Sequence, residues 1–226
     1  MKKTLMIGFL AMLAGAAHAD LLQVSAFGGY STFNMGKLND SLDKNKANSA
    51  TLTKDTRPTS GYMAGVEVGS GLLIPIPFTQ VELRGELDGP GTAEQANSSF
   101  DYKIDSLLTS VMLGLKVSLT PPLSPLGFGV GAYGGYGYAV LKTTSTNGSS
   151  LPSGDQYTGG GFVGELEAKL SYKLMPLLSL DLFGGMRFAN FASVTDGNNT
   201  MKDGNNADLP IDFSGFDGGA GLTLSF

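Results

Sequence analysis

Ten ionisable residues stand at alternate positions of segments that otherwise alternate between polar and apolar residues. Residues two apart on a β-strand point to the same face, so neighbouring members of this set could interact. Two such carboxylates could act as general acid and base, a continuous series could carry ions or protons, and opposite charges could form ion pairs. The ten residues are Glu67, Glu82, Arg84, Glu86, Lys116, Glu165, Glu167, Lys169, Asp181 and Arg187.

A hydrolytic site built on Glu82 and Glu86, or on Glu165 and Glu167, lacks the other groups that such a reaction needs. The chain has no cysteine, and its single histidine, His18, lies in a segment expected to be removed. Histidine is the usual base near neutral pH, and histidine and cysteine are the usual zinc ligands. The sequence therefore predicts neither an enzyme nor a metal or cofactor site. It favours a network of ion pairs over a narrow path for ions or protons.

Eight segments show the period-two pattern of a half-buried β-strand. In residues 78–88, Val81, Leu83 and Leu87 share one face and the charged residues share the other. The predicted strands are residues 22–33, 60–70, 78–88, 104–119, 127–142, 161–174, 177–190 and 212–226.

The connections between these strands alternate in length. Those after the first, third, fifth and seventh strands are polar and run over 26, 15, 18 and 21 residues. The others, at residues 71–77, 120–126 and 173–176, are short and apolar or rich in proline. Short turns at one end and long loops at the other are typical of outer-membrane barrels. The fold class predicted is all-β, an eight-stranded antiparallel up-and-down transmembrane β-barrel.

Aromatic residues favour the membrane over a soluble barrel of the lipocalin type, which alternates similarly but turns its apolar face inward. They gather near the strand ends, as two interfacial girdles would require. With the charged faces turned inward, ion pairs would fill a lumen that is just wide enough for side chains. The predicted girdles are Tyr30, Tyr62, Tyr102, Tyr138, Phe162 and Phe188 at the long-loop end, and Phe78, Phe128, Tyr172 and Phe226 at the other.

The N-terminus has the pattern of a cleaved secretory signal peptide. Two lysines precede an apolar run of about 13 residues, which is too short to span a membrane. The run ends in an A-x-A site formed by Ala17 and Ala19. We therefore expect a leader at residues 1–19 and one barrel domain at residues 20–226. Without the two leader lysines the net charge falls from −5 to −7, which argues against nucleic acid as a partner.

Two of the long loops carry features of their own. Residues 34–47 place Met35, Leu38 and Leu42 at helical spacing, which predicts a short amphipathic helix that either packs over the barrel mouth or binds a partner. The last loop contains Asp196, Asp203 and Asp208, which could supply oxygen ligands to a loosely bound Ca²⁺. A solvated loop explains the same residues, because turns also favour Asp, Asn and Gly.

The last ten residues resemble the C-terminal assembly signal of bacterial outer-membrane barrels. The matching positions are a polar residue, a glycine and alternating apolar residues before a terminal aromatic: Asp217, Gly219, Leu222, Leu224 and Phe226. As a whole, the chain resembles the small eight-stranded outer-membrane proteins of the OmpA transmembrane-domain-like and OmpX-like group, although it lacks tryptophan. The resemblance implies an outer-membrane location, recognition by the barrel-assembly machinery, and contact with outer-membrane lipid and lipopolysaccharide.

The function expected is a structural or adhesive one, with the extracellular loops as the surface that meets an unidentified partner. A narrow channel or transporter for small ions or apolar solutes is the alternative. A soluble periplasmic carrier of the lipocalin type is a third hypothesis.

Overall fold

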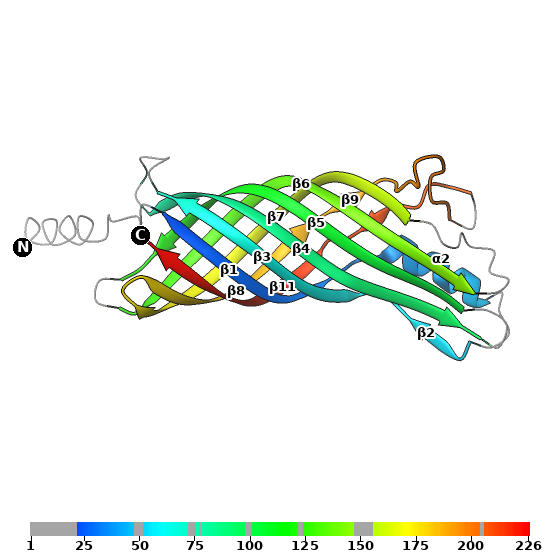
Figure 1. Ribbon diagram of the computed structural model, residues 1–226, viewed down its shortest axis with the longest axis horizontal. Coiled ribbons are helices and arrows are strands. Elements are labelled where there is room, and N and C mark those ends of the chain that lie inside the picture. The colour runs from blue at the N-terminus through cyan, green and yellow to red at the C-terminus, as the bar shows by residue number, and fades with distance from the viewer. Residues whose placement is uncertain are drawn as a thin grey trace, which may run out of the picture.

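Eight long strands close into an antiparallel barrel in the computed structural model of the chain (Figure 1). Each strand pairs with its neighbours in the chain, and the first pairs with the last, so the predicted eight-stranded up-and-down barrel is confirmed. The strands are β1 (Gln23–Thr32), β3 (Ser60–Ser70), β4 (Thr79–Ala96), β5 (Asp101–Leu119), β6 (Leu126–Thr146), β7 (Gln156–Met175), β8 (Leu178–Phe188) and β11 (Gly215–Ser225).

The structure describes residues 22–47, 52–71, 76, 78–97, 101–121, 124–146, 156–203 and 206–226. The expected leader at residues 1–19, with Ala17 and Ala19, lies outside the described residues.

Apolar side chains cover the outside of the barrel wall, and the charged residues of the same strands point inward. Along β5, for example, Val111 and Leu113 are 57% and 60% exposed, whereas Ser110 and Met112, which alternate with them, are buried. The other outward apolar residues include Val66, Leu83, Leu87, Leu115, Val130, Leu166, Leu170, Leu182, Leu222 and Leu224. A wall with this polarity has its apolar face turned away from the interior, opposite to a soluble lipocalin-type barrel.

Strands β4 to β7 are longer than the sequence predicted. They contain 18 to 21 residues, against 10 or 11 in β1, β3, β8 and β11. Toward this end the polarity of the two faces reverses while the side-chain directions continue unchanged: Tyr102 and Ile104 are buried inside, and Lys103 and Asp105 lie on the outer face. Tyr102 is therefore not a girdle residue, and the predicted 15- and 18-residue loops are partly strand. The prediction was wrong here because it assumed one polarity along each strand.

An apolar core fills the extended part of the barrel. The helix α2 (Gly36–Ala47) lies inside this end (Figure 1), with Met35, Leu38 and Leu42 no more than 2% exposed. The predicted helix is thus confirmed, with its apolar side packed into the barrel mouth. The last loop also contributes, so it is not simply solvated; its buried residues are Val194, Met201, Leu209, Ile211 and Phe213. No helix in the described ranges has the length and apolar character needed to cross a membrane.

Three short strands complete the extended end, none of which the sequence predicted. β2 (Lys54–Thr56) pairs with the end of β4, and β9 (Asn190–Phe191) pairs with β10 (Ile211–Asp212). β2 joins the first loop to the barrel sheet, and β9 with β10 forms a separate two-stranded sheet that joins the two ends of the last loop.

The seam between β1 and β11 depends on close packing of glycines. Gly29 and Gly219 face each other in the register, and a Cβ on Gly219 would lie 2.2 Å from the carbonyl oxygen of Gly28. Gly219 also leaves room for the ring of Phe183 in the lumen. Phe226 continues the seam, because its amide donates to the carbonyl of Leu22 at 2.9 Å. The C-terminal segment therefore closes the barrel.

Candidate functional site: the charged interior of the barrel

All ten ionisable residues singled out in the sequence lie inside the barrel. Each is at most 6% exposed, and they come from β3, β4, β5, β7 and β8. The alternation of side-chain direction along each strand places them there, because the apolar residues between them face outward. The interior therefore gathers side chains that are up to about a hundred positions apart in the chain.

Arg84 is the centre of the largest cluster. Its guanidinium donates to Glu67 at 3.0 Å, to Glu167 at 2.5 Å, and to Glu165. The same group lies over the buried ring of Tyr133, 4.0 Å from its centroid. Three carboxylates and an aromatic face thus surround a single buried cation, which is the environment that a planar guanidinium fits best.

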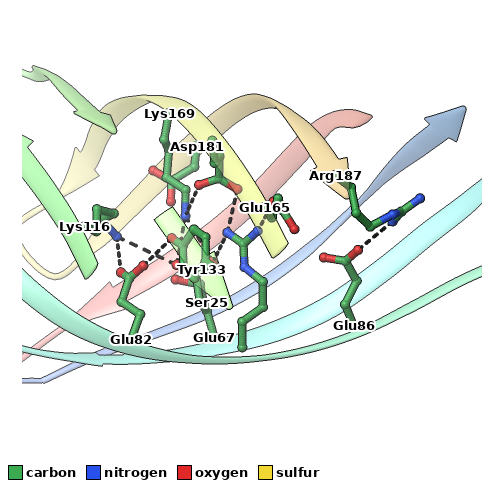
Figure 2. Close-up of polar contacts among 12 residues, drawn as sticks. Ser25, Glu67, Glu82, Glu86, Lys116, Tyr133, Glu165, Lys169, Asp181 and Arg187 are labelled. Carbon is green, nitrogen blue, oxygen red and sulfur yellow. Dashed lines mark hydrogen bonds and ion pairs between the residues drawn. The ribbon is translucent and has the colours of Figure 1, made fainter. Parts of the chain in front are cut away.

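Two lysines extend this cluster toward the end of the barrel that carries the short turns. Lys169 lies 3.0 Å from Glu67 and 3.4 Å from Glu167, and Lys116 pairs with Glu82. The hydroxyl of Tyr133 donates to Glu82 at 2.5 Å. Figure 2 shows these groups converging from opposite walls of the barrel. The central cluster, defined here as Glu67, Glu82, Arg84, Lys116, Tyr133, Glu165, Glu167 and Lys169, contains four acids and three bases.

A second cluster lies around Arg187, on the side of the apolar core. Its guanidinium donates to Glu86 at 3.0 Å and to Asp88 at 2.6 Å, and its Nε donates to the carbonyl of Phe213 at 3.2 Å. The hydroxyl of Ser31 donates to Asp88 at 2.7 Å. In Figure 2 the pair of Glu86 and Arg187 stands apart from the other labelled residues. This second cluster is thus the layer directly below the apolar core.

Asp181 does not join the ion pairs. The hydroxyl of Thr223 donates to it at 2.5 Å, and Thr223 is 2.7 Å from the hydroxyl of Ser25. Among the described residues it has no cationic partner within ion-pair distance. The expectation that Asp181 belongs to the ion-pair network was therefore wrong, because the stagger of β8 places it beside hydroxyl groups of β1 and β11.

Sequence reasoning missed three interior residues. Asp88 lies two positions after Glu86 on the same face, so continued alternation would have found it. Tyr133 lies between Gly131 and Gly135 on the inner face of β6, and its ring occupies the space that Cβ atoms on Gly114 and Gly131 would fill. Asp217, assigned only to the C-terminal signal, is 8% exposed and also points inward. The contact between Tyr133 and Arg84 could not be predicted, because it joins β6 to β4 over Gly114 of the intervening strand β5.

The C-terminal signal residues fall on both faces of β11. Leu222, Leu224 and Phe226 are outward and 44 to 57% exposed, while Asp217 and Gly219 face the interior. Outward exposure leaves the apolar and aromatic side chains available for contact with another molecule or with lipid.

The interior carboxylates are poorly placed for hydrolysis. Glu165 and Glu167 both accept hydrogen bonds from Arg84, and Glu82 accepts from Lys116 and Tyr133. The side chains of both pairs are also at most 5% exposed, so a substrate in solution cannot reach them. Of the paired carboxylates proposed from the sequence, neither pair is free to act on a substrate.

The acids of the last loop are held separately. Asp196 accepts from the amides of Asn198 and Asn199, and Asp208 pairs with Lys202. Within the described ranges, no three or more acidic, histidine or cysteine side chains are grouped so as to hold a metal ion. The Ca²⁺ site considered from the sequence gains no support.

A polar clasp holds α2 against β2 at the extended end. Asp55 accepts from Lys46 of the helix at 2.8 Å, and Arg57 bridges Asp55 to Asp43. The amide of Gln95 donates to the carbonyl of Leu42 at 2.8 Å. These polar contacts thus hold α2 in place in addition to its apolar packing.

We expect acid to loosen this clasp. The hydrogen bond from Lys46 lowers the pKa of Asp55 below its ordinary value. The stabilisation is therefore present above the ordinary pKa of about 4 and is lost as the pH falls through the lowered one. Because these groups are partly solvated, the loss should be less than about 1 kcal/mol. Hydrogen-exchange protection of the α2 amides, corrected for intrinsic rates, should fall between about pH 6 and about pH 2.

The matched variants are Asp55→Asn and, in the last loop, Asp208→Asn. Asp55→Asn should lower the protection already at neutral pH and remove most of the acid dependence, and Asp208→Asn should leave both unchanged. Equal acid dependence in the wild type and in Asp55→Asn would contradict the assignment.

Comparison with known proteins identifies similar solved structures only. No family model and no curated protein sequence matches this chain. Neisserial surface protein A is 15% identical, over 91% of this chain and 95% of that one, with a TM-score of 0.44. The outer membrane protein OprG from Pseudomonas aeruginosa is 14% identical, over 92% and 97%, with a TM-score of 0.45. Ail, the attachment invasion locus protein of Yersinia pestis, is 11% identical, over 90% and 97%, with a TM-score of 0.40.

Proposed function

We propose that this chain is an outer-membrane β-barrel with a closed lumen and a structural or adhesive role, and that it is not an enzyme. One observation carries the proposal: two layers of different chemistry fill the interior in series. Buried ion pairs around Arg84 and Arg187 form the first, and the apolar core around α2 forms the second. In this proposal residues 1–19 are a cleaved leader and residues 20–226 form the barrel domain.

The outer surface supports the membrane location. A band of exposed apolar side chains surrounds the barrel, and Tyr30, Tyr62, Phe162 and Phe188 stand on its outer face toward the extended end. Above that level the outer face becomes charged, as in the pair of Lys54 and Glu94. This change from an apolar to a charged outer face is expected where the barrel wall passes from the hydrocarbon layer into water.

The extended end is the surface proposed to meet partners. Lys54, Lys103 and Lys142 lie on its outer wall or rim, where ammonium groups could contact the phosphates of lipopolysaccharide. The solvent side of α2 and the last loop offer a further surface for an unidentified partner. Because the net charge is negative, the proposal does not include nucleic acid as a partner.

We expect the refolded barrel to conduct no steady current in a planar lipid bilayer. Two filled layers in series leave no continuous water path, and moving an ion past the central cluster would require breaking buried ion pairs. The measurement is single-channel recording after addition of the purified, refolded protein, with a porin preparation as the positive control. Reproducible unitary currents would favour the channel alternative, and recovery as a soluble periplasmic protein would favour a carrier.

We expect Phe226→Ala to lower the amount of assembled barrel in cells while barely changing the stability of the refolded protein. The ring is 57% exposed, so its loss removes little packing, and the backbone contact with Leu22 remains. The proposed recognition by the assembly machinery, in contrast, depends on the terminal aromatic. Assembled barrel is measured as the heat-modifiable band of the outer-membrane fraction, with Phe216→Ala as the matched control for an exposed aromatic of the same strand. Equal assembly of both variants would contradict a signal at Phe226.

A further inference from the structure

The short-turn end of the barrel carries an apolar rim that continues beyond the strands. We define the periplasmic crown as the described residues of this rim: Ile76, Leu119, Pro121, Pro125, Leu126, Leu174, Met175, Pro176 and Leu177. Its large side chains are 47 to 63% exposed. All crown residues except Leu119 come from the sequence segments 71–77, 120–126 and 174–177, which contain no charged residue and hold six of the ten prolines. Turns exposed to water ordinarily favour Gly, Pro, Asn, Asp and Ser, so the large apolar side chains and the lack of charge distinguish these turns, not the prolines.

Prolines reduce the number of backbone donors at the crown. Proline has no amide hydrogen, so each proline removes one donor from the turns. Two amides beside the crown are bonded locally: Ser124 donates to the carbonyl of Pro121 at 3.1 Å, and Lys173 donates to that of Pro125 at 2.7 Å. The amide of Leu126 donates to the hydroxyl of Ser124 at 3.1 Å. Internal satisfaction of backbone groups is what a chain needs where lipid replaces water.

Polar groups at this level point into the lumen instead of outward. Ser118, Thr120, Ser171 and Lys173 line an open cavity of about 150 Å³ at the barrel mouth. At the opposite, extended end, the arrangement is reversed, with charged residues outside and apolar residues inside. The two ends of the barrel are therefore built for different surroundings.

We propose that the periplasmic crown lies within the periplasmic leaflet, with lipid as its occupant. The inference rests on the proposed membrane location. The crown is continuous with the apolar band of the wall: Leu119 pairs with Phe128, and Leu126 pairs with Tyr172, two exposed aromatics of that end.

The length of the apolar face agrees with this placement. On β7 the outward apolar run extends from Phe162 to Leu174, a strand length of roughly 40 Å at about 3.3 Å per residue. At a tilt of about 40° this is roughly 30 Å along the membrane normal, more than the apolar band of about 25 Å typical of such barrels. A bilayer that covers the whole of this apolar face therefore reaches the short-turn end.

Tryptophan fluorescence can test the depth of the crown, because the chain has no tryptophan of its own. The crown reporters are Met175→Trp and Leu177→Trp. Leu115→Trp reports the middle of the apolar band, and Thr144→Trp reports the outer wall of the extended end. Each variant is refolded into phosphatidylcholine vesicles with or without bromine atoms on the upper part of the acyl chains, after its heat-dependent gel shift confirms folding.

Both crown reporters should behave like Leu115→Trp: blue-shifted emission, loss of fluorescence in brominated vesicles, and little loss on addition of iodide. Thr144→Trp should show the opposite response. The inference would be overturned if iodide quenched the crown reporters and brominated lipid did not, while brominated lipid still quenched Leu115→Trp. The proposed membrane location would be unaffected by that result. If brominated lipid does not quench Leu115→Trp either, the proposed membrane location itself is contradicted.

Discussion

Arg84→Met should lower the free energy of unfolding by about 3 to 5 kcal/mol, the range measured when one partner of a buried ion pair is removed. Methionine keeps much of the side-chain volume but leaves Glu67, Glu165 and Glu167 without their shared cation. Their negative charges would then lie close together in an interior that solvates them poorly. The change is measured by urea unfolding of the protein refolded in lipid vesicles, followed by circular dichroism.

The matched control is Lys54→Met at the extended end. Lys54 also pairs with a carboxylate, that of Glu94, but its side chain is 55% exposed. We expect a loss below about 1 kcal/mol, because water replaces the lost partner. Similar losses for both variants would mean that the interior is hydrated, and the closed lumen would have to be abandoned.

Leu113→Arg should destabilise the barrel by roughly 2 to 4 kcal/mol, the cost of an arginine on the lipid face near the bilayer midplane. Leu113 is 60% exposed and lies on β5 between Val111 and Leu115, which are also outward. In water an exposed leucine tolerates this change, so the cost arises only from lipid. The same unfolding experiment in vesicles gives the free energy.

Thr144→Arg provides the control for this prediction. Thr144 is exposed on the outer wall of the extended end, where it pairs with Lys103 in the register. Its replacement should change the free energy of unfolding by no more than about 0.5 kcal/mol, as for ordinary surface substitutions. A Leu113→Arg protein as stable as the wild type would contradict the lipid-facing assignment of the wall.

The sequence alone determined the number and antiparallel order of the barrel strands and placed the ten charged residues on the inner face. These features follow from local rules, because side chains alternate along a strand with a period of two and short apolar turns can join only neighbouring antiparallel strands. All ten charged residues assigned to the interior lie there for this reason. The helix in the first long loop was likewise visible from the spacing of Met35, Leu38 and Leu42.

Only the tertiary structure decided which charges meet and what closes the barrel. Arg84 pairs with residues 17, 81 and 83 positions away, and Asp181 meets hydroxyl groups instead of a cation. These contacts depend on the stagger between strands across a closed barrel, which no local pattern records. The apolar core of the extended end escaped prediction because the inner face changes from charged to apolar there, as Tyr102 and Ile104 show, while the side chains keep their alternation. A period of two defines two faces of a strand. The surroundings of each face, however, change with the position of the residue along the barrel axis.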